Sequence, residues 1–164
     1  LRHIDLVREM SMSEVVRLSQ AFRKIRIEPG EFVLREGESS DMFYVLLEGR
    51  VEITRNNQRV NILPKGSHFG EMAILSLRPR SASVRTLEAC RLLVAQREEL
   101  YQFLQAEPML AAKFFWKLAQ TLSLRLDEFY VAADRPPEVN MRNTLRFGHY
   151  PSPFGGPTGS SDDE

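Results

Sequence analysis

The most specific pattern of this chain lies at residues 69–85, which read Phe69-Gly-Glu-Met-Ala-Ile-Leu-Ser-Leu-Arg-Pro-Arg-Ser-Ala-Ser-Val-Arg85. Gly70 allows the backbone to come close to a ligand, and free N–H groups at a helix start point at an anion. Glu71 can accept hydrogen bonds from sugar hydroxyls, and Arg80 can donate two parallel hydrogen bonds to a phosphate. The stretch therefore predicts binding of a small sugar phosphate rather than bond-making chemistry.

The composition of the chain excludes several classes of protein. The 164 residues, 43% of them hydrophobic, are enough for one domain with a core. The 22 basic and 22 acidic residues balance, which argues against a general binder of nucleic acid or membrane surfaces. No apolar run approaches the ~18 residues that suggest a membrane span. We therefore expect a cytoplasmic protein without a membrane segment.

Cysteine and histidine usage argues against a disulfide, a metal site and catalysis. The single cysteine, Cys90, fits a reducing compartment and is interpreted as a small packed side chain. His68 is interpreted as a turn histidine. The three histidines are scattered, so they cannot form the ligand cluster of a metal-dependent jelly-roll enzyme. The first residue is Leu1 rather than Met, so we expect the chain to be cut from a longer protein.

Short strands are predicted around the 69–85 stretch. Residues 3–22 are helix-like, with Ser13 as the N-cap. Asn56-Asn57 is a tight hairpin turn, because asparagine tolerates the positive φ that such turns need. Turns every 8–12 residues are typical of an antiparallel sandwich or barrel, here of about eight strands. The segments that we predict as strands are 24–27, 32–35, 42–47, 51–54, 58–63, 81–87 and 90–95.

Two helices and a tail are predicted after the strands. The first helix covers 97–106 and is ended by Pro108; an amphipathic helix follows at about 109–131. Residues 134–164 are rich in proline, glycine and serine, so we predict a mostly disordered tail. We expect one domain at 1–133, with its barrel at about 23–96. The predicted apolar face of the long helix consists of Leu110, Phe114, Phe115, Leu118, Ala119, Leu122, Leu126 and Phe129.

Over about residues 3–131 these patterns resemble the cyclic-nucleotide-binding domain family, in its bacterial regulatory form. The phosphate-binding cassette of that family matches Phe69-Gly70-Glu71 together with Arg80-Ser81-Ala82. The resemblance implies a mainly β fold: an eight-stranded antiparallel jelly-roll barrel with an N-terminal helical segment and two C-terminal helices. The supporting glycines, in the order that the family has them, are Gly30, Gly37, Gly49 and Gly66.

The resemblance also implies roles for individual residues. Glu71 is expected to accept from the ribose 2′-OH, and Arg80 to bind an exocyclic oxygen of the cyclic phosphate. Backbone N–H groups of the short cassette helix are expected to face the anion. Ser81 is expected to donate from its backbone N–H, and Ala82 to be small because the backbone packs against the ligand. The expected binding set is Gly70, Glu71, Met72, Ala73, Arg80, Ser81 and Ala82.

Base selectivity and the lid over the base are also implied by the resemblance. A threonine after the arginine accompanies cGMP in the family and an alanine accompanies cAMP, and Ser81 lies between them. Because Arg80-Ser81-Ala82 also resembles the pattern of the bacterial cAMP-dependent transcription activator, we favour cAMP over cGMP. The last helix is expected to cover the base, with an arginine able to stack on the purine. Packing of that helix on the barrel is the alternative for its apolar side chains. The candidate lid residues are Thr121, Leu122, Arg125 and Phe129.

The implied function is that of a sensor whose ligand is cAMP or cGMP, without a further cofactor. The nucleotide would move the last helix and so control an effector domain or partner protein, which would lie before Leu1. We expect no DNA-binding domain, because Arg135-Pro-Pro opens a polar tail too short for one. The alternative is a degenerate member used for docking or dimerisation, and retention of Glu71 with Arg80 argues against it. The sequence leaves open whether the chain forms a homodimer.

Overall fold

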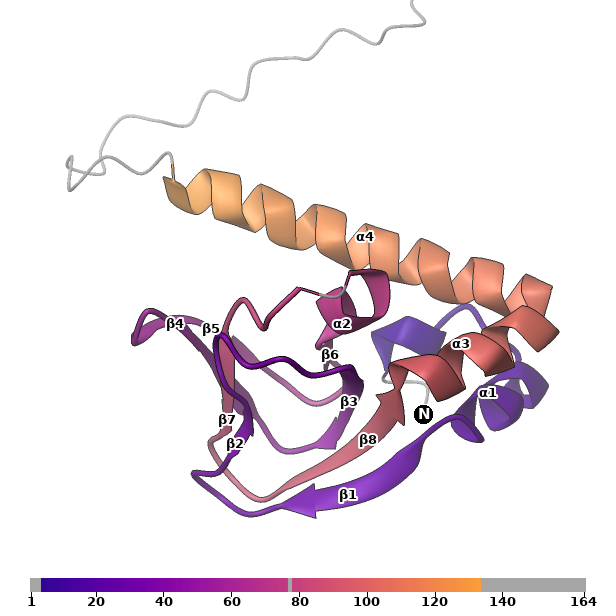
Figure 1. Ribbon diagram of the computed structural model, residues 1–164, viewed down its shortest axis with the longest axis horizontal. Coiled ribbons are helices and arrows are strands. Elements are labelled where there is room, and N and C mark those ends of the chain that lie inside the picture. Colours follow the sequence, from indigo (N-terminus) through magenta and orange to yellow (C-terminus); the bar gives the residue numbers. More distant parts are fainter. Residues whose placement is uncertain (1–3, 77, 134–164) are drawn as a thin grey trace, which may run out of the picture.

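The structure, a computed structural model, describes residues 4–76 and 78–133, and Figure 1 shows strands with helices along one side. The predicted tail at 134–164 lies outside the described residues. Eight strands form two antiparallel four-stranded sheets, as the sequence predicted. One sheet has the order β1 (Arg23–Ile27), β8 (Cys90–Gln96), β3 (Met42–Glu48) and β6 (His68–Phe69). The other has the order β2 (Phe32–Leu34), β7 (Ser83–Thr86), β4 (Val51–Arg55) and β5 (Gln58–Leu63).

The predicted hairpin at Asn56-Asn57 is confirmed. These two residues have φ angles of 50° and 61°, and they join β4 to β5 in a register that pairs Arg55 with Gln58. A two-residue loop with positive φ at both positions matches the right-handed twist of the strands that it connects. Cys90 is fully buried at the start of β8, so its interpretation as a packed side chain is also confirmed.

The N-terminal helical segment is shorter than predicted, and its N-cap is a different serine. It consists of a 3₁₀ turn, η1 (Asp5–Val7), and the helix α1 (Met12–Ser19). The N-cap is Ser11, whose hydroxyl accepts from the Glu14 backbone N–H at 3.3 Å, while the Glu14 carboxylate accepts from the Ser11 N–H at 2.7 Å. A capping box needs a glutamate three residues after the cap. Ser11 has one and Ser13 does not, so Ser13 was the wrong choice.

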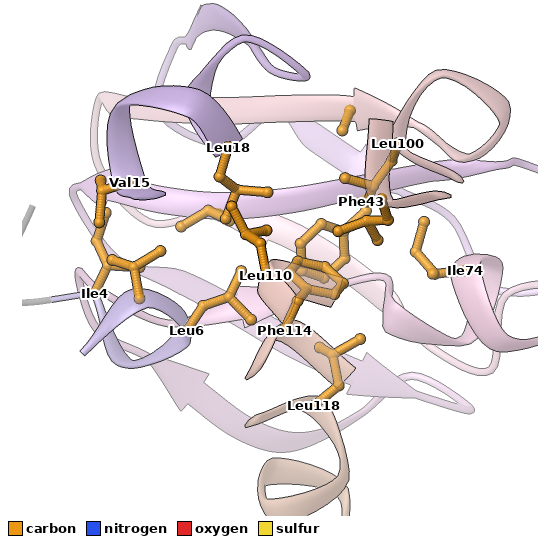
Figure 2. Packing of buried hydrophobic residues seen from close by; sticks show 14 residues of the cluster. Ile4, Leu6, Val15, Leu18, Phe43, Ile74, Leu100, Leu110, Phe114 and Leu118 are labelled. Carbon is orange, nitrogen blue, oxygen red and sulfur yellow. The ribbon is translucent and has the colours of Figure 1, made fainter. Parts of the chain in front are cut away.

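Three more helices complete the fold: α2 (Glu71–Leu75), α3 (Arg97–Ala106) and α4 (Pro108–Ala133). They pack against the first sheet through an apolar cluster that Figure 2 shows around Phe43 and Phe114. The two rings meet edge to face, with their centroids 5.9 Å apart. A second cluster, centred on Leu46 and Leu92, fills the space between the sheets. α4 is therefore anchored to the barrel by apolar contacts.

The predicted apolar face of α4 is correct at its first members and wrong at Ala119 and Leu126. Leu110, Phe114 and Leu118 are buried, as expected. Ala119 is exposed, and Leu126 is 52% exposed, so neither contributes to the core. The side chain of Phe129 lies outside the described residues. Beyond Leu118 no described side chain of α4 is fully buried, and the contact with the barrel includes the polar one made by Arg125.

His68 is not the turn histidine that the sequence indicated. It lies in β6, pairs with Val45 of β3 and is 2% exposed, with its ring 5.8 Å from that of Phe43. Neither ring nitrogen has a hydrogen-bond partner within the described residues. Burial, with a smaller contribution from the Arg125 guanidinium, lowers the pKa of His68 to about 4 from its ordinary value of 6.5. The ring is therefore neutral in the folded protein at pH 7.

The glycines at two turns differ in what surrounds them, which allows a matched test of the fold. Both Gly37 and Gly49 have positive φ, +81° and +90°. A Cβ at Gly49 would lie 2.6 Å from Cys90 Sγ and 2.9 Å from the Ala89 carbonyl oxygen, whereas a Cβ at Gly37 would meet nothing within 4 Å. We expect Gly37→Ala to lower the free energy of unfolding by about 1 kcal/mol through backbone strain. Gly49→Ala should cost ~1–3 kcal/mol more. Equal urea midpoints for the two variants would contradict the close packing of this turn on β8.

Burial of neutral His68 predicts a pH dependence of stability. The unfolded chain takes up a proton on this side chain below its ordinary pKa and the folded chain does not, so stability falls as the pH drops from about 6.5 towards 4. Between pH 7 and 5 we expect a loss of about 2 kcal/mol from this residue. Urea unfolding of wild type and His68→Leu at both pH values measures it. The variant should lose less than wild type; parallel losses would show that His68 titrates normally.

Candidate functional site

A cavity of about 330 Å³ lies against the second sheet, between α2 and the far part of α4. Six of the seven predicted binding residues line it, namely Gly70, Glu71, Met72, Arg80, Ser81 and Ala82. The seventh, Ala73, is buried behind them, and its N–H donates to the Gly70 carbonyl at 3.0 Å. The fold thus brings the two ends of the 69–85 stretch to one place.

Gly70 positions the start of α2 at the edge of the cavity. It is the N-cap of this helix and has φ 80° and ψ 15°, a left-handed conformation that glycine adopts without steric cost. A Cβ at this position would lie 2.9 Å from the Met42 carbonyl oxygen and 3.1 Å from Arg80 Nη1. A larger residue would therefore displace either β3 or the arginine. Because Gly70 has no side chain, the N-terminus of α2 and the Arg80 guanidinium can lie directly next to each other.

Arg80 is buried, and it is held by neutral groups. It is 6% exposed; its Nη2 donates to the Met42 carbonyl at 2.6 Å and to Ser40 Oγ at 2.8 Å, and its Nη1 donates to the Gly70 carbonyl at 3.3 Å. These partners fix the guanidinium at the wall of the cavity. Its backbone is fixed too, since its N–H donates to the Glu38 carbonyl at 2.9 Å.

No carboxylate in the described part of the chain contacts the Arg80 guanidinium directly. It forms no ion pair there, and its Nε is buried without a hydrogen-bond partner. Burial lowers the pKa of Arg80 from its ordinary value, and the nearby Tyr44, Asp41 and Glu71 oppose this effect. A buried cation without a counter-charge carries a large desolvation cost. An anion in the cavity would offset that cost, so the site has the electrostatics of an anion receptor.

Glu71 connects the cavity to α4. It is 7% exposed, and its Oε1 accepts from Arg125 Nη1 at 2.5 Å. Arg125 Nη2 donates to the His68 carbonyl at 2.6 Å, so a single guanidinium on α4 contacts both β6 and α2. The other oxygen, Glu71 Oε2, is buried without a partner among the described residues. It remains available to a hydroxyl group of a ligand.

Of the four candidate lid residues, the structure brings one to the cavity. Arg125 lines it. The Thr121 hydroxyl donates to the Lys117 carbonyl of its own helix at 3.1 Å, and Leu122 is half-buried without lining the cavity. The side chain of Phe129 is not among those described, so its role in the lid stays a prediction.

The apolar wall of the cavity was not assigned by sequence reasoning. It comes from five strands, β2, β4, β5, β6 and β7. Alternation in a strand indicates which side chains face inward, but it does not separate those that line the cavity from those in the core. Val60 and Asn61 of the edge strand β5 also line the cavity, and Val60 is 63% exposed. The residues that were missed are Leu34, Ile53, Val60, Asn61, Leu63, Phe69, Arg78, Pro79 and Val84.

No group of three or more histidine, cysteine or acidic side chains in residues 4–76 and 78–133 is placed to hold a metal ion. No helix in the same ranges is long and apolar enough to span a membrane.

Comparison with known proteins points to one family. A model of the cyclic nucleotide-binding domain matches residues 24–107, which is just over half of the chain. The cGMP-dependent protein kinase of Plasmodium berghei is 36% identical over 84 residues, covering 51% of this chain and 10% of the kinase. The cAMP-dependent protein kinase regulatory subunit of Dictyostelium discoideum is 30% identical over 95 residues, covering 53% of this chain and 29% of the subunit. The chain thus matches less than a third of the length of either relative.

A solved structure extends the match to most of the described fold. The crystal structure of a cyclic nucleotide-binding domain from Methylobacillus flagellatus has a TM-score of 0.73 and 25% identity, with 84% of each chain covered. The fold is that of a regulatory binding module rather than of a catalytic domain. The matched residues include the whole 69–85 stretch, with Glu71 and Arg80 at the cavity. The chain belongs to the cyclic nucleotide-binding domain family.

Proposed function

We propose that this domain is a sensor that binds a cyclic nucleotide, cAMP in preference to cGMP, in the cavity next to Arg80. The observation that carries the proposal is the buried guanidinium of Arg80, which forms no ion pair among the described residues and has its Nε unpartnered. The cyclic phosphate supplies one negative charge and acceptor oxygens at the cavity wall. Charge-assisted hydrogen bonds between guanidinium and phosphate are among the strongest in proteins. In this proposal the ligand supplies the negative charge that would offset the desolvation cost of the buried Arg80 guanidinium.

The ribose completes the second polar contact. Glu71 Oε1 is occupied by Arg125, and Oε2 is free and buried. A ribose 2′-OH donating to Oε2 would satisfy this carboxylate without displacing Arg125. In this arrangement Arg125 holds the carboxylate in position for the sugar.

The base lies against the apolar wall in this proposal. Val60 on β5 offers an exposed apolar surface at the cavity, and Arg125 on the opposite side can stack on a purine. Ser81 lines the cavity and is neither the threonine typical of cGMP binding nor the alanine typical of cAMP binding. The preference for cAMP therefore rests on the resemblance of Arg80-Ser81-Ala82 to the pattern of the bacterial cAMP-dependent activator. The two kinase relatives named above are called cGMP-dependent and cAMP-dependent, so the names of relatives support neither nucleotide over the other.

Ligand binding is coupled to α4 through Glu71 and Arg125 in this proposal. α4 contacts the cavity through Arg125, while its buried side chains Leu110, Phe114 and Leu118 lie nearer its N-terminal end. A ligand that binds Glu71 changes the strength of the Arg125 contact and so the population of the docked helix. An effector domain or partner protein would then respond to the position of α4. Docking or dimerisation without nucleotide is the alternative function.

Titration with cAMP and cGMP tests the proposed function. At about 100 times its dissociation constant, a ligand should add about 2.7 kcal/mol of stability, a clear rise in the midpoint of thermal unfolding. The larger affinity should be for cAMP. No rise with either nucleotide would favour the docking alternative, and a larger affinity for cGMP would contradict the assignment based on Arg80-Ser81-Ala82.

Arg80→Ala should weaken cyclic-nucleotide binding at least ~30-fold, because losing one partner of a buried charge pair costs roughly 2–5 kcal/mol. Arg78→Ala is the matched control, since Arg78 also lines the cavity but is exposed. Its effect should stay below about threefold, as expected for an exposed charge. Isothermal titration calorimetry measures both. Equal losses of affinity in the two variants would mean that the cavity attracts the phosphate through its overall positive charge and not through a specific contact with Arg80.

Arg125→Ala should reduce the ability of Glu71 to recognise the ribose hydroxyl. Wild type is expected to bind cAMP about tenfold more tightly than 2′-deoxy-cAMP, as for one hydrogen bond to a charged group. In Arg125→Ala this ratio should fall towards one, because the carboxylate is no longer held in place. Leu124→Ala, a change at an exposed neighbour, is the control and should keep the wild-type ratio. An unchanged ratio in Arg125→Ala would show that Arg125 only packs α4 on the barrel.

A further inference from the structure

His68 is a polar side chain at a position where an apolar one would pack better. It is 2% exposed, its ring centroid lies 5.8 Å from that of Phe43, and neither ring nitrogen has a hydrogen-bond partner within the described residues. A neutral imidazole carries one donor and one acceptor, and leaving both unpaired in the interior costs free energy. Packing of the core therefore gives no reason for a histidine at this position.

The helix α4 contacts the barrel at His68 itself and at the neighbouring Phe43. Phe114 packs edge to face on Phe43, and Arg125 Nη2 donates to the His68 carbonyl at 2.6 Å. Buried Leu118 lies between Phe114 and Arg125 on the same helix, and Figure 1 shows α4 running past α2 and β6. Docked α4 therefore helps to exclude water from the imidazole, and release of its second half would open the ring to solvent.

Charged groups on three elements face His68, and their signs balance. Asp5 of η1 and Glu71 of α2 favour the protonated ring, whereas Lys117 and Arg125 of α4 disfavour it. Among the described residues, the paired strand β3 contributes no such group. Burial has the largest influence, and it lowers the pKa of His68 to about 4. Both cations that oppose protonation belong to α4, so release of this helix would remove them together with the cover.

We propose that His68 is a proton-sensitive switch for the docking of α4. The docked helix covers a neutral ring, so a proton taken up by His68 in the undocked state must be released before the helix can dock. Protons and α4 therefore compete, and acidification from pH 7 to pH 5 shifts the population towards the undocked helix. A further consequence, lower nucleotide affinity at low pH, rests on the proposed function, in which docking of α4 and nucleotide binding are coupled.

The size of the effect follows from the two protonation equilibria of His68. The pKa is about 4 for the covered ring and 6.5 for an exposed one, so the ratio of docked to undocked molecules should fall about twentyfold between pH 7 and pH 5. Nucleotide affinity should fall by about three- to twentyfold. The larger value applies if the undocked state is already populated at pH 7.

Distances between α4 and the barrel test the switch without any nucleotide. In the full chain, nitroxide labels on Leu87→Cys, between β7 and β8, and on Leu124→Cys of α4 report the position of the helix by pulsed electron resonance. Both positions are exposed, and buried Cys90 stays unlabelled. One distance should dominate at pH 7, and a second, longer one should grow at pH 5. Near-ultraviolet circular dichroism at pH 5 shows that the barrel remains folded.

Two variants separate His68 from other titrating groups. In the doubly labelled His68→Leu protein the pH 7 distance should dominate at both pH values. The variant keeps the Arg125 contact, which uses the backbone carbonyl of residue 68. His149→Leu is the matched control, because it removes another histidine of the chain and should behave as wild type. Identical distances at both pH values in wild type would overturn the switch. The same change in His68→Leu would also overturn it and assign the change to Asp5 or Glu71.

Calorimetric titration with cAMP at both pH values measures the consequence for binding. Between pH 7 and pH 5, wild type should lose at least about threefold more affinity than His68→Leu, as the shift in docking requires. A pH-dependent distance without this loss would contradict the coupling of α4 to the nucleotide. Absence of binding at either pH would contradict the proposed function, whereas the distance measurements would still decide for or against the switch.

Discussion

The site depends on one interaction, the placement of the Arg80 guanidinium beside the start of α2 with neutral partners only. Three oxygen atoms, from Ser40, Met42 and Gly70, hold the positive charge without neutralising it. Such an arrangement is unfavourable in the absence of ligand, because a buried charge is desolvated. The rest of the fold provides the rigidity that sustains it. Strand β3, the loop before it and the glycine at the helix start are all needed to keep the charge at the cavity wall.

The antiparallel sandwich explains why Glu71 and Arg80, nine residues apart in sequence, meet at this wall. Glu71 begins α2, just after β6 of the first sheet, and Arg80 precedes β7 of the second sheet. The segment between them therefore connects the two sheets. The Arg80 N–H donates to the Glu38 carbonyl, and the Gly37 N–H donates to the Arg80 carbonyl, which ties the end of this segment to the loop between β2 and β3. The cavity thus lies where both sheets, α2 and α4 meet. This position connects the polar contacts of a ligand with a helix that extends away from the barrel.

Sequence reasoning reached the fold and much of the site because both depend on short-range patterns. Turn residues such as Asn56-Asn57 and the spacing from Gly70 to Arg80 are local and easily recognised. It failed where the outcome depends on neighbours that are distant in sequence. His68 was misplaced because a two-residue strand has no periodicity to detect, and its burial follows from pairing with β3. The N-cap is Ser11 and not Ser13 because only Ser11 is followed, three residues later, by a glutamate that completes a capping box. Ala119 and Leu126 continue the apolar spacing of α4, yet both are exposed. The sequence of α4 alone does not indicate which of its apolar residues are buried against the barrel.

The contact between Arg125 and Glu71 has a thermodynamic consequence that does not depend on the identity of the effector. If a nucleotide strengthens the docking of α4 by some factor, then docking of α4 strengthens nucleotide binding by the same factor. Any protein that captures the far end of α4 and draws it from the barrel must therefore also promote release of the nucleotide, and any protein that presses the helix onto the barrel must retain it. Nucleotide affinity measured for the domain by itself would then differ from its affinity within an assembly. Under the proposed function, the carboxylate of Glu71 would then help to set the nucleotide concentration at which such an assembly responds.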